Sequence, residues 1–363
     1  MIGSPSAYFR FPQNKGEARA PLEAAPRRIV EDGLVRLGRF DAPVREMNLP
    51  DARLLKGLGG SWPLPPLVVE WVGAGLAHPE WYLGLIVVDA KAGSLAVLYG
   101  YNRRTGEYFS HDRPGLRRQV RVAPSTWNDT TSFEGRGFRV EMRHRLEQGF
   151  HEVDVAIAAS GKKPAVEGRL RWHEELGKNR PLVLMSPLEG GGFLYNHKAQ
   201  MPIEGSLRIG GDSFKFDPHR DVANMDDLKL HPGGLRLRYR WFNFAGFDSQ
   251  GRLVGVDLAH ADQKGDPYWA ENSLWVGDKL FPLDEVDFQL DPRDPSKPWR
   301  AADKDGRIAL TFFPEGGKAV SLGPLGRYYQ KCGRFQGKIT DVSGETHEIR
   351  DYYGCAECAN VLS

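Results

Sequence analysis

The sequence has little cysteine and no long apolar segment. It holds only three cysteines in 363 residues, too few to cross-link a fold of this size, which indicates a reducing environment. No stretch approaches the roughly 18 consecutive apolar residues that a membrane-spanning helix needs, and residues 1–15 lack the apolar core of a secretory signal. These absences predict a cytoplasmic protein without a membrane span.

The sequence also lacks an excess of charge of one sign. Lysine and arginine number 49, aspartate and glutamate 47, and the formal net charge is +2. Basic residues gather only in short groups such as Arg117-Arg118 and Lys162-Lys163, whereas a protein that follows nucleic-acid phosphates needs a longer basic stripe. We therefore expect a small-molecule partner and no nucleic acid; the oligomeric state stays open.

Several catalytic signatures are missing as well. The chain has no G-x-S-x-G elbow, no Ser-His-Asp order, no Walker loop and no G-x-G-x-x-G in a strand–helix–strand context. Those motifs position a nucleophile or a nucleotide phosphate, so their absence disfavours the enzymes that use them. We expect no organic cofactor.

The cysteines also form a weak metal motif. Cys355 and Cys358 make a C-x-x-C, with Cys332 and His347 nearby in sequence. A structural zinc site needs four converging ligands and usually a second closely spaced pair, which this chain lacks. We therefore expect two thiols on a C-terminal turn and no metal.

What the sequence does contain is a regular alternation of apolar and polar residues in short segments. The 42 glycines and 25 prolines divide the chain, and turn signals such as RTG at 104–106, DSQG at 248–251 and KDG at 304–306 separate segments such as YLGLIVV at 82–88, HEVDVAI at 151–157 and RIALTF at 307–312. This spacing predicts an all-β protein of antiparallel sandwiches or barrels. Only residues 44–58 suggest a helix, which Pro50 limits.

The expected number of strands is too high for one small barrel. About twenty segments suit two antiparallel β-barrels of roughly eight to ten strands each. The Gly-Gly-Gly run at 190–192 is the best boundary. We predict an extended tail over residues 1–28, an N-terminal barrel over 29–190 and a C-terminal barrel over 191–363.

The segment 225–272 carries most of the candidate site. Alternation on one strand places Trp241 and Asn243 on the same face, and Asp257 interrupts an apolar run on the next strand of the same hairpin. We expect these three residues to border one cavity in the C-terminal barrel, with Asp226 entering it from the preceding loop. A carboxyl group in an apolar barrel mouth has a raised pKa, which suits proton transfer near neutral pH. An alternative is that Asp226 caps a turn, and that Asp257 faces solvent.

Other residues of the same region complete the candidate list. His231 and Glu271 are further candidates for proton transfer, although a histidine in a β-protein is more often structural. Candidates for ligand binding are Lys198, which pairs with a buried carboxylate or an anionic ligand, the apolar wall Trp269, and the polar residues His260 and Asn272. Each tryptophan is equally suited to a barrel core.

Taken in order along the chain, a set of short motifs resembles the family of the domain of unknown function 2804. The N-terminal half matches loosely through GRF at 38–40, WY at 81–82 and YNRRTG at 101–106. The second half matches through YNHK at 195–198, PIEG at 202–205, FKFD at 214–217, MD at 225–226, RWFN at 240–243, GVDL at 255–258, EN at 271–272, PW at 298–299, LTFFP at 310–314, CGRFQG at 332–337 and GCAE at 354–357. The matches cover most of residues 30–360.

This resemblance implies two lipocalin-like barrels in tandem, since the family is similar to carotenoid 1,2-hydratases and to fungal enzymes that guide pericyclic cyclisation. The segment Met225-Asp226 followed by Trp241 is the part most similar to the hydratases. The hydratase pattern continues with His or Arg and then Trp-Gly, whereas Asp227-Leu228 follows here, so a catalytic role does not transfer directly.

Two hypotheses of function follow. One is a cofactor-independent acid–base enzyme, a hydratase, dehydratase, isomerase or cyclase, acting on a hydrophobic isoprenoid- or polyketide-like molecule. The other is a non-catalytic carrier of such a ligand; a carbohydrate-active lyase or hydrolase is a third possibility, because carboxylates beside tryptophans also suit sugars. A carrier needs only shape and apolar walls, so the density of ionisable residues between 226 and 271 favours the enzyme.

Overall fold

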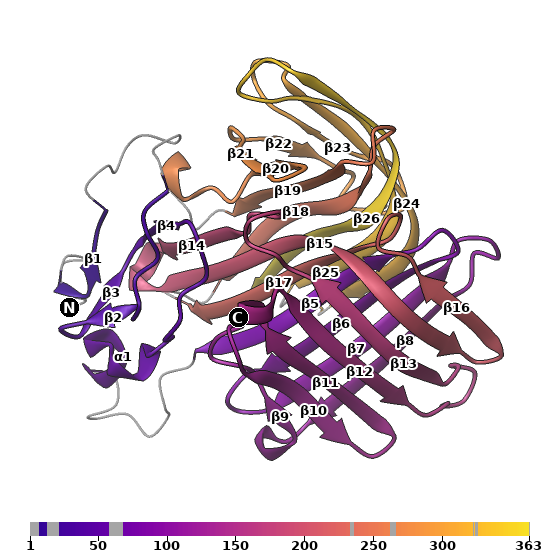
Figure 1. The fold of residues 1–363 in the computed structure, drawn as a ribbon, viewed down its shortest axis with the longest axis horizontal. Helices are drawn as coiled ribbons and strands as arrows, with labels where there is room; N and C mark the ends of the chain where they lie inside the picture. The colour runs from indigo at the N-terminus through magenta and orange to yellow at the C-terminus, as the bar shows by residue number, and fades with distance from the viewer. Residues whose placement is uncertain are drawn as a thin grey trace.

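The computed structural model describes residues 7–12, 22–57, 68–232, 236–261, 266–321, 323 and 326–362. Nearly all of its regular structure is β. Two curled, near-closed antiparallel sheets form the barrels, and they pack side by side with the long central strands between them (Figure 1). The predicted all-β architecture of two antiparallel barrels is confirmed, although the first sheet has more strands than the roughly eight to ten expected for each barrel.

The first barrel is a 14-stranded sheet that runs from β8 through β5, β17, β15 and β13 to β9, with β14, β4 and β16 attached at β15 and β14. Its strands are β4 (Gly38–Phe40), β5 (Val69–Ala77), β6 (Trp81–Asp89), β7 (Ser94–Asn102), β8 (Tyr108–Gly115), β9 (Val120–Arg121), β10 (Thr130–Gly135), β11 (Phe138–Arg145), β12 (Phe150–Ile157), β13 (Val166–His173), β14 (Leu182–Pro187), β15 (Phe193–Ile209), β16 (Asp212–Phe216) and β17 (Val222–His231).

The second barrel is a nine-stranded sheet in the order β21-β20-β19-β18-β26-β25-β24-β23-β22. Its strands are β18 (Arg236–Phe247), β19 (Leu253–Ala261), β20 (Ser273–Val276), β21 (Lys279–Pro282), β22 (Asp287–Gln289), β23 (Trp299–Ala302), β24 (Ile308–Ser321), β25 (Gly326–Thr340) and β26 (Thr346–Leu362). The predicted hairpin at 248–251 joins β18 to β19, with Asn243 directly opposite Asp257.

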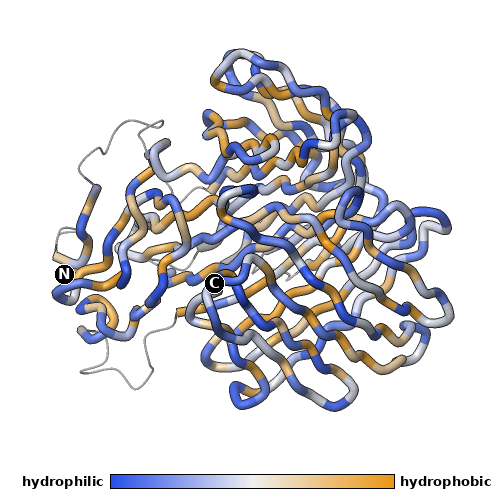
Figure 2. Tube along the Cα trace, viewed as in Figure 1, coloured by the Kyte–Doolittle hydropathy of each residue, from blue (hydrophilic) through white to orange (hydrophobic). Residues whose placement is uncertain are grey.

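Residue alternation explains why these segments form strands. In β12, buried residues alternate with half-buried or exposed ones from Phe150 to Ile157, because successive side chains of a strand point to opposite faces. The same alternation of apolar and polar residues is visible along the strands in Figure 2. The inward side chains build one apolar core inside each barrel.

The N-terminal segment adds a small third sheet beside the barrels, of β1 (Phe9–Arg10), β2 (Val30–Glu31) and β3 (Leu34–Arg36). Its apolar residues share a core with β14 and the start of β15. The helix expected within 44–58 is reduced to a 3-10 turn (Leu49–Asp51), which contains Pro50, and the five-residue α1 (Arg53–Gly57).

The chain changes from one sheet to the other after β17, between His231 and Arg236. Strands β15 and β17 follow the expected boundary at 190–192 but belong to the first sheet, where they fill the gap between β13 and β5. A division into domains at residue 190 stays a prediction, whereas the sheets themselves divide later in the chain.

Candidate functional site

The candidate site lies at the seam where the two barrels meet. We use the term seam for the surface between the outer face of β5, β6, β7, β15 and β17 and the outer face of β18, β19, β25 and β26. On β15, His197 and Met201 point into the first barrel, so the alternate residues Lys198 and Gln200 point out into the seam. Lys198 bonds to the second barrel there.

Lys198 forms a buried ion-pair cluster that crosses the seam. Its Nζ atom lies 2.9 Å and 3.0 Å from the two carboxylate oxygens of Asp257 and 2.6 Å from Glu271 Oε2. All three residues are buried. Burial opposes the charge of Lys198, but the two carboxylates outweigh it and raise the pKa of the ammonium group.

Asp257 is the central acceptor of the cluster. Besides Lys198, its Oδ2 atom accepts hydrogen bonds from Trp241 Nε1 at 2.8 Å and Asn243 Nδ2 at 2.9 Å. Burial raises the pKa of Asp257, and Lys198 opposes that shift. These hydrogen bonds bring Asp257, Trp241 and Asn243 together, as the sequence predicts, but not inside the C-terminal barrel. Val256 and Leu258 belong to that core, so Asp257 points into the seam.

Asp226 faces the same cluster from the first barrel. It lies within strand β17, opposite Lys198 in the register with β15, and not in a loop as expected. Its pKa is raised to about 8: burial is the largest cause, the carboxyl groups of Asp257, Glu271 and Glu357 add to the rise, and Lys198 opposes it. The side chain keeps some accessible surface, whereas its Oδ1 atom is buried without a hydrogen-bond partner among the described residues.

Glu357 is a further acidic residue of the site that the sequence analysis missed. Its carboxylate accepts hydrogen bonds from Tyr239 at 2.7 Å and from Gln330 Nε2 at 2.8 Å. Burial raises the pKa of Glu357, although these hydrogen bonds oppose the shift. The C-terminal turn expected at 355–358 is wrong, because these residues lie within β26. Tyr353, Cys355 and Glu357 occupy alternate positions along the chain, and this period of two was the sequence signal for a strand that carries Glu357 on one face.

Aromatic side chains line the seam beside the charged cluster. Tyr82 packs on Tyr353 of the other barrel with ring centroids 5.4 Å apart, and Lys198 Nζ lies 5.2 Å from the centroid of the Trp241 ring. Gly84 makes room for this layer, since a Cβ atom there would lie 2.1 Å from the Tyr99 ring. The seam therefore combines flat apolar walls with buried acidic groups.

Four of the expected site residues do not join this cluster. His231 lies at the end of β17 beside Phe193, and His260 is exposed near the end of β19. Trp269 packs in the N-terminal core with Tyr268. Asn272 fixes local backbone, accepting from the Ala259 N–H and donating to the Asp284 carbonyl.

The three cysteines do not converge on a common point. Cys355 faces the seam with Cys332, directly opposite on β25, whereas Cys358 packs against the core of the second barrel. Residues three apart on a strand point to opposite faces. Burial raises the pKa of Cys332 to about 12, so this thiol is not a ready ligand or nucleophile.

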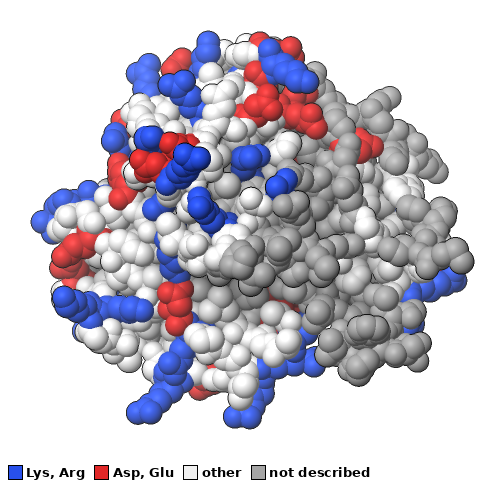
Figure 3. All heavy atoms as spheres, turned by 180° about the vertical axis from the view of Figure 1, so that it is seen from behind, with Lys and Arg blue, Asp and Glu red and all other residues white. Residues whose placement is uncertain are grey.

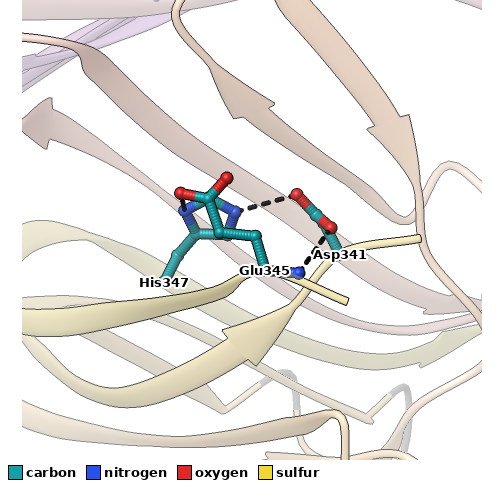
Figure 4. Close-up of side chains that lie close together, drawn as sticks. All are labelled: Asp341, Glu345 and His347. Carbon is teal, nitrogen blue, oxygen red and sulfur yellow. Dashed lines mark hydrogen bonds and ion pairs between the residues drawn. The ribbon is translucent and has the colours of Figure 1, made fainter. Parts of the chain in front are cut away.

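Asp341, Glu345 and His347 are grouped closely enough to suggest a metal centre. Figure 4 shows the His347 ring between the two carboxyl groups at the turn between β25 and β26. Asp341 Oδ1 already accepts from Ser343 N at 2.8 Å and Glu345 N at 3.1 Å, and Oδ2 lies 3.0 Å from His347 Nε2. These bonds lower the pKa of Asp341 to about 2 despite desolvation. The cluster closes a hairpin, as Asp commonly does.

A second buried polar network lies inside the first barrel. Glu174 accepts from His151 Nε2 and His197 Nε2, each at 2.8 Å, and His144 Nδ1 lies 3.1 Å from His151 Nδ1. All four side chains are fully buried. Burial would raise the pKa of Glu174, yet His197 and His151 outweigh it and hold that pKa below its usual value. This network faces away from the seam.

One face of the outer surface can be examined for charge in Figure 3. On the face drawn in Figure 3, the described basic and acidic side chains are interspersed without a continuous stripe of one sign. A surface hollow lined by Arg28, Asp51, Arg53 and Lys56 belongs to the N-terminal segment and shares no residue with the seam. Within the described ranges, no helix is long and apolar enough to cross a membrane.

Comparison with solved structures shows the fold. Kievitone hydratase from Nectria haematococca aligns with a TM-score of 0.52 at 12% identity, over 82% of this chain and 89% of that one. The protein CghA aligns with a TM-score of 0.53 at 13% identity over the same shares. Identities this low establish a common fold and nothing about the substrate.

One curated protein also matches in sequence. The 23S rRNA (uracil(1939)-C(5))-methyltransferase RlmD of Dechloromonas aromatica (strain RCB) is 24% identical over 185 residues, 47% of this chain. The chain spans only 38% of the length of that relative, so the activity of the whole methyltransferase does not transfer.

A family-wide comparison covers far more of the chain. The profile of the family named Domain of unknown function (DUF2804) matches residues 31–361, a range that includes both barrels and every residue of the seam cluster. The chain therefore belongs to the DUF2804 family.

Proposed function

We propose that this protein is a cofactor-independent acid–base enzyme whose active site is the seam between the barrels. Its reaction would be a hydration, dehydration, isomerisation or cyclisation of a hydrophobic isoprenoid- or polyketide-like molecule. The name of kievitone hydratase, which shares the fold, supports the choice of reaction class. The buried acidic cluster beside aromatic walls supports the choice of site.

The observation that carries the proposal is the position of Asp226, whose carboxyl group lies opposite Lys198 beside two more buried carboxyl groups. With a pKa of about 8, its carboxyl group is mostly protonated at neutral pH and is a stronger acid than water by many orders of magnitude. A general acid is most effective when its pKa lies near the working pH. Its Oδ1 atom is buried without a hydrogen-bond partner among the described residues, and in this proposal a bound substrate would pair with it.

The neighbouring residues keep Asp226 in this state. Asp257 and Glu271 neutralise Lys198, so the ammonium group does not ionise Asp226 fully. In a hydration, the Asp226 proton would pass to an alkene carbon, and water would add to the resulting cation. The proton that this water then releases would return to the Asp226 carboxylate, so the net change is the addition of one water molecule. In an isomerisation, Asp226 would donate one proton, Glu357 would accept the proton that leaves the substrate, and exchange with water would restore both groups.

The test is a substrate screen with wild type and Asp226→Asn. Purified protein is incubated with panels of prenylated phenols, terpenoid alkenes and unsaturated polyketides in ¹⁸O-labelled or deuterated water, and the products are analysed by mass spectrometry. We expect incorporation of solvent oxygen or deuterium by wild type and a loss of about 10²-fold or more in Asp226→Asn, the usual scale for a general acid. The exposed Asp212 provides the control variant Asp212→Asn.

The same screen separates the alternatives. Binding of panel members without turnover, unchanged by Asp226→Asn, would identify a carrier. Turnover that is confined to an added oligosaccharide panel would identify a carbohydrate-active enzyme. An Asp226→Asn variant that keeps full turnover would refute the role of Asp226.

A further inference from the structure

The seam contains three buried amide side chains that make no hydrogen bond to any residue the structure describes. Asn196, Gln200 and Asn224 are 0%, 1% and 4% exposed, and both the oxygen and the nitrogen of each side-chain amide are buried without a partner among the described residues. Buried amides are normally paired, because desolvation without a hydrogen bond costs free energy. Three such groups in one region therefore need an explanation.

These amides share the face that carries the acidic cluster. Asn196 and Gln200 lie two residues before and after Lys198 on β15, and Asn224 lies two residues before Asp226 on β17. Gln200 and Asn224 are direct partners in the register of the two strands, two residue pairs along from Lys198 and Asp226. Residues two apart on a strand project to the same side, so the amides form a row on either side of the ion-pair cluster.

The row faces the second barrel. A Cβ atom at Gly255 of β19 would lie 2.7 Å from Gln200 Cγ, which places the Gln200 side chain against the second sheet. The absence of a side chain at Gly255 thus provides room for the amide. On the facing strand β18, Asn243 uses its nitrogen for Asp257 but leaves Oδ1 buried and unpaired.

The charges of the seam restrict what these amides can bind. Among the described residues, the buried Lys198 is already held by Asp257 and Glu271, and the buried Arg39 also interacts electrostatically with Glu271. Two more carboxyl groups, Asp226 and Glu357, lie close enough to influence each other. A carboxylate, phosphate or sulfonate would enter a region where acidic groups outnumber cations. Like charges in a poorly solvated site repel strongly, so the seam disfavours anions.

We propose that the seam binds a neutral, oxygenated small molecule, with Asn196, Gln200 and Asn224 as the subsite for its carbonyl and hydroxyl groups. An amide offers both a donor and an acceptor, so ketones accept from the amide nitrogen and hydroxyls donate to the amide oxygen. The inference rests on the proposed function for the location of the reacting group at Asp226, and it narrows the substrate from hydrophobic molecules in general to neutral ones that carry several oxygen atoms.

The test uses three naphthalene fluorophores of similar size. 6-Propionyl-2-dimethylaminonaphthalene is neutral and carries a ketone, 2-dimethylaminonaphthalene lacks the ketone, and 1-anilinonaphthalene-8-sulfonate is anionic. Binding to the full chain is titrated by fluorescence and by calorimetry. We expect saturable binding of the ketone that is at least tenfold tighter than that of either other probe.

The variants Gln200→Met and Asn224→Leu replace the amides by apolar groups of similar shape, and Gln148→Met, at an exposed position, is the matched control. Each seam variant is expected to weaken ketone binding about tenfold. The same variants are expected to unfold at an equal or higher denaturant concentration than wild type, because an unpaired buried amide is removed. Gln148→Met is expected to change neither property.

Two binding results would overturn the inference: no binding of the ketone, or equal affinity of the ketone for wild type and both seam variants. Seam variants that are clearly less stable than wild type would also overturn it, because they would show that the amides are paired within the protein. The Asp226→Asn variant separates this inference from the proposed function. Lost turnover with retained ketone binding supports both, whereas absence of turnover in wild type together with amide-dependent binding contradicts the proposed function alone.

Discussion

Lys198 is the residue on which the charge balance of the seam depends. A single ammonium group contacts two buried carboxylates from the other barrel. Removing one partner of a buried ion pair is far more costly than exchanging the whole set for apolar groups, because the remaining charges stay desolvated.

We therefore predict that Lys198→Met lowers the free energy of unfolding by about 3–5 kcal/mol. The measurement is urea denaturation followed by tryptophan fluorescence. Adding Asp257→Asn and Glu271→Gln to the same chain removes the stranded charges and is expected to recover a large part of the loss. A triple variant as unstable as Lys198→Met would contradict this explanation.

Asp226 gives the stability of the protein a characteristic pH dependence. Its pKa is about 8 in the folded state and about 3.9 in an unfolded chain, so between these values the folded state keeps a proton that the unfolded state releases. Stability must then fall as pH rises across this interval.

We predict that the free energy of unfolding of wild type falls by up to about 1.4 kcal/mol per pH unit between pH 5 and 8, relative to that of Asp226→Asn. The variant lacks this effect because its amide has no proton to release. Denaturation curves of the two proteins at several pH values measure the difference. Infrared difference spectra provide a direct check, since the protonated carboxyl band should disappear with a midpoint near pH 8. Parallel stability profiles for the two proteins would contradict the assignment.

At the scale of the elements, alternation along β15 and β17 places two unrelated polar networks on opposite sides of one sheet. On β15, His197 points into the first barrel and Lys198 points into the seam. On β17, Asp227 likewise points into the first barrel and Asp226 points into the seam. A shift of register by one residue would exchange the two networks, so the pairing of these strands is strongly specified.

The inner network should contribute to stability in a defined pH window. The lowered pKa of Glu174 means that its contribution is present above its unfolded pKa of about 4.3 and is lost as pH falls through the lower folded value. The pKa of His197 is raised, because the Glu174 carboxylate outweighs the effect of burial. Its contribution is full below about pH 6.5 and is lost as pH rises through the folded value.

We predict that Glu174→Gln destabilises the protein by about 3–5 kcal/mol, with the largest effect between about pH 4.3 and 6.5. Thermal unfolding of wild type and variant across pH 4–9 is the measurement, with Glu175→Gln, on the exposed neighbour, as control. A variant that loses no more stability at pH 5.5 than at pH 9 would show that His197 is not charged in the folded protein.

At the scale of the whole molecule, the boundary between the two barrels follows the sheets and falls between β17 and β18. Because β15 and β17 connect β13 to β5, a chain that stops at residue 190 lacks the strands that complete the first sheet. Unpaired strand edges inside a sheet promote aggregation.

We predict that a fragment of residues 1–232 unfolds cooperatively and resists proteolysis, whereas a fragment of residues 1–190 does not. Circular dichroism and limited proteolysis of the two purified fragments test this expectation. A well-folded 1–190 fragment beside an aggregated 1–232 fragment would place the domain boundary at the glycine run instead.

The sequence was sufficient for the architecture, since period-two alternation and turn residues depend on neighbours along the chain. The hairpin at 248–251, with Asn243 opposite Asp257, was predictable for the same reason. Alternation also separates the two faces of a strand. It does not say which face meets water, a barrel core or a second barrel, and that is why Asp257 was expected inside the C-terminal barrel.

The sequence by itself determined the all-β class, the two-barrel organisation and the grouping of Trp241, Asn243 and Asp257, because these follow from local patterns. The sequence also predicted that Asp226 lies near these residues, but only the tertiary structure decided that Lys198, Glu271 and Glu357 join them in one cluster between the barrels. Asp226 and Glu357 are 131 residues apart and lie on different sheets. Their proximity, and the raised pKa values of both carboxyl groups, arise only when packing of the barrels removes water from the surface between them.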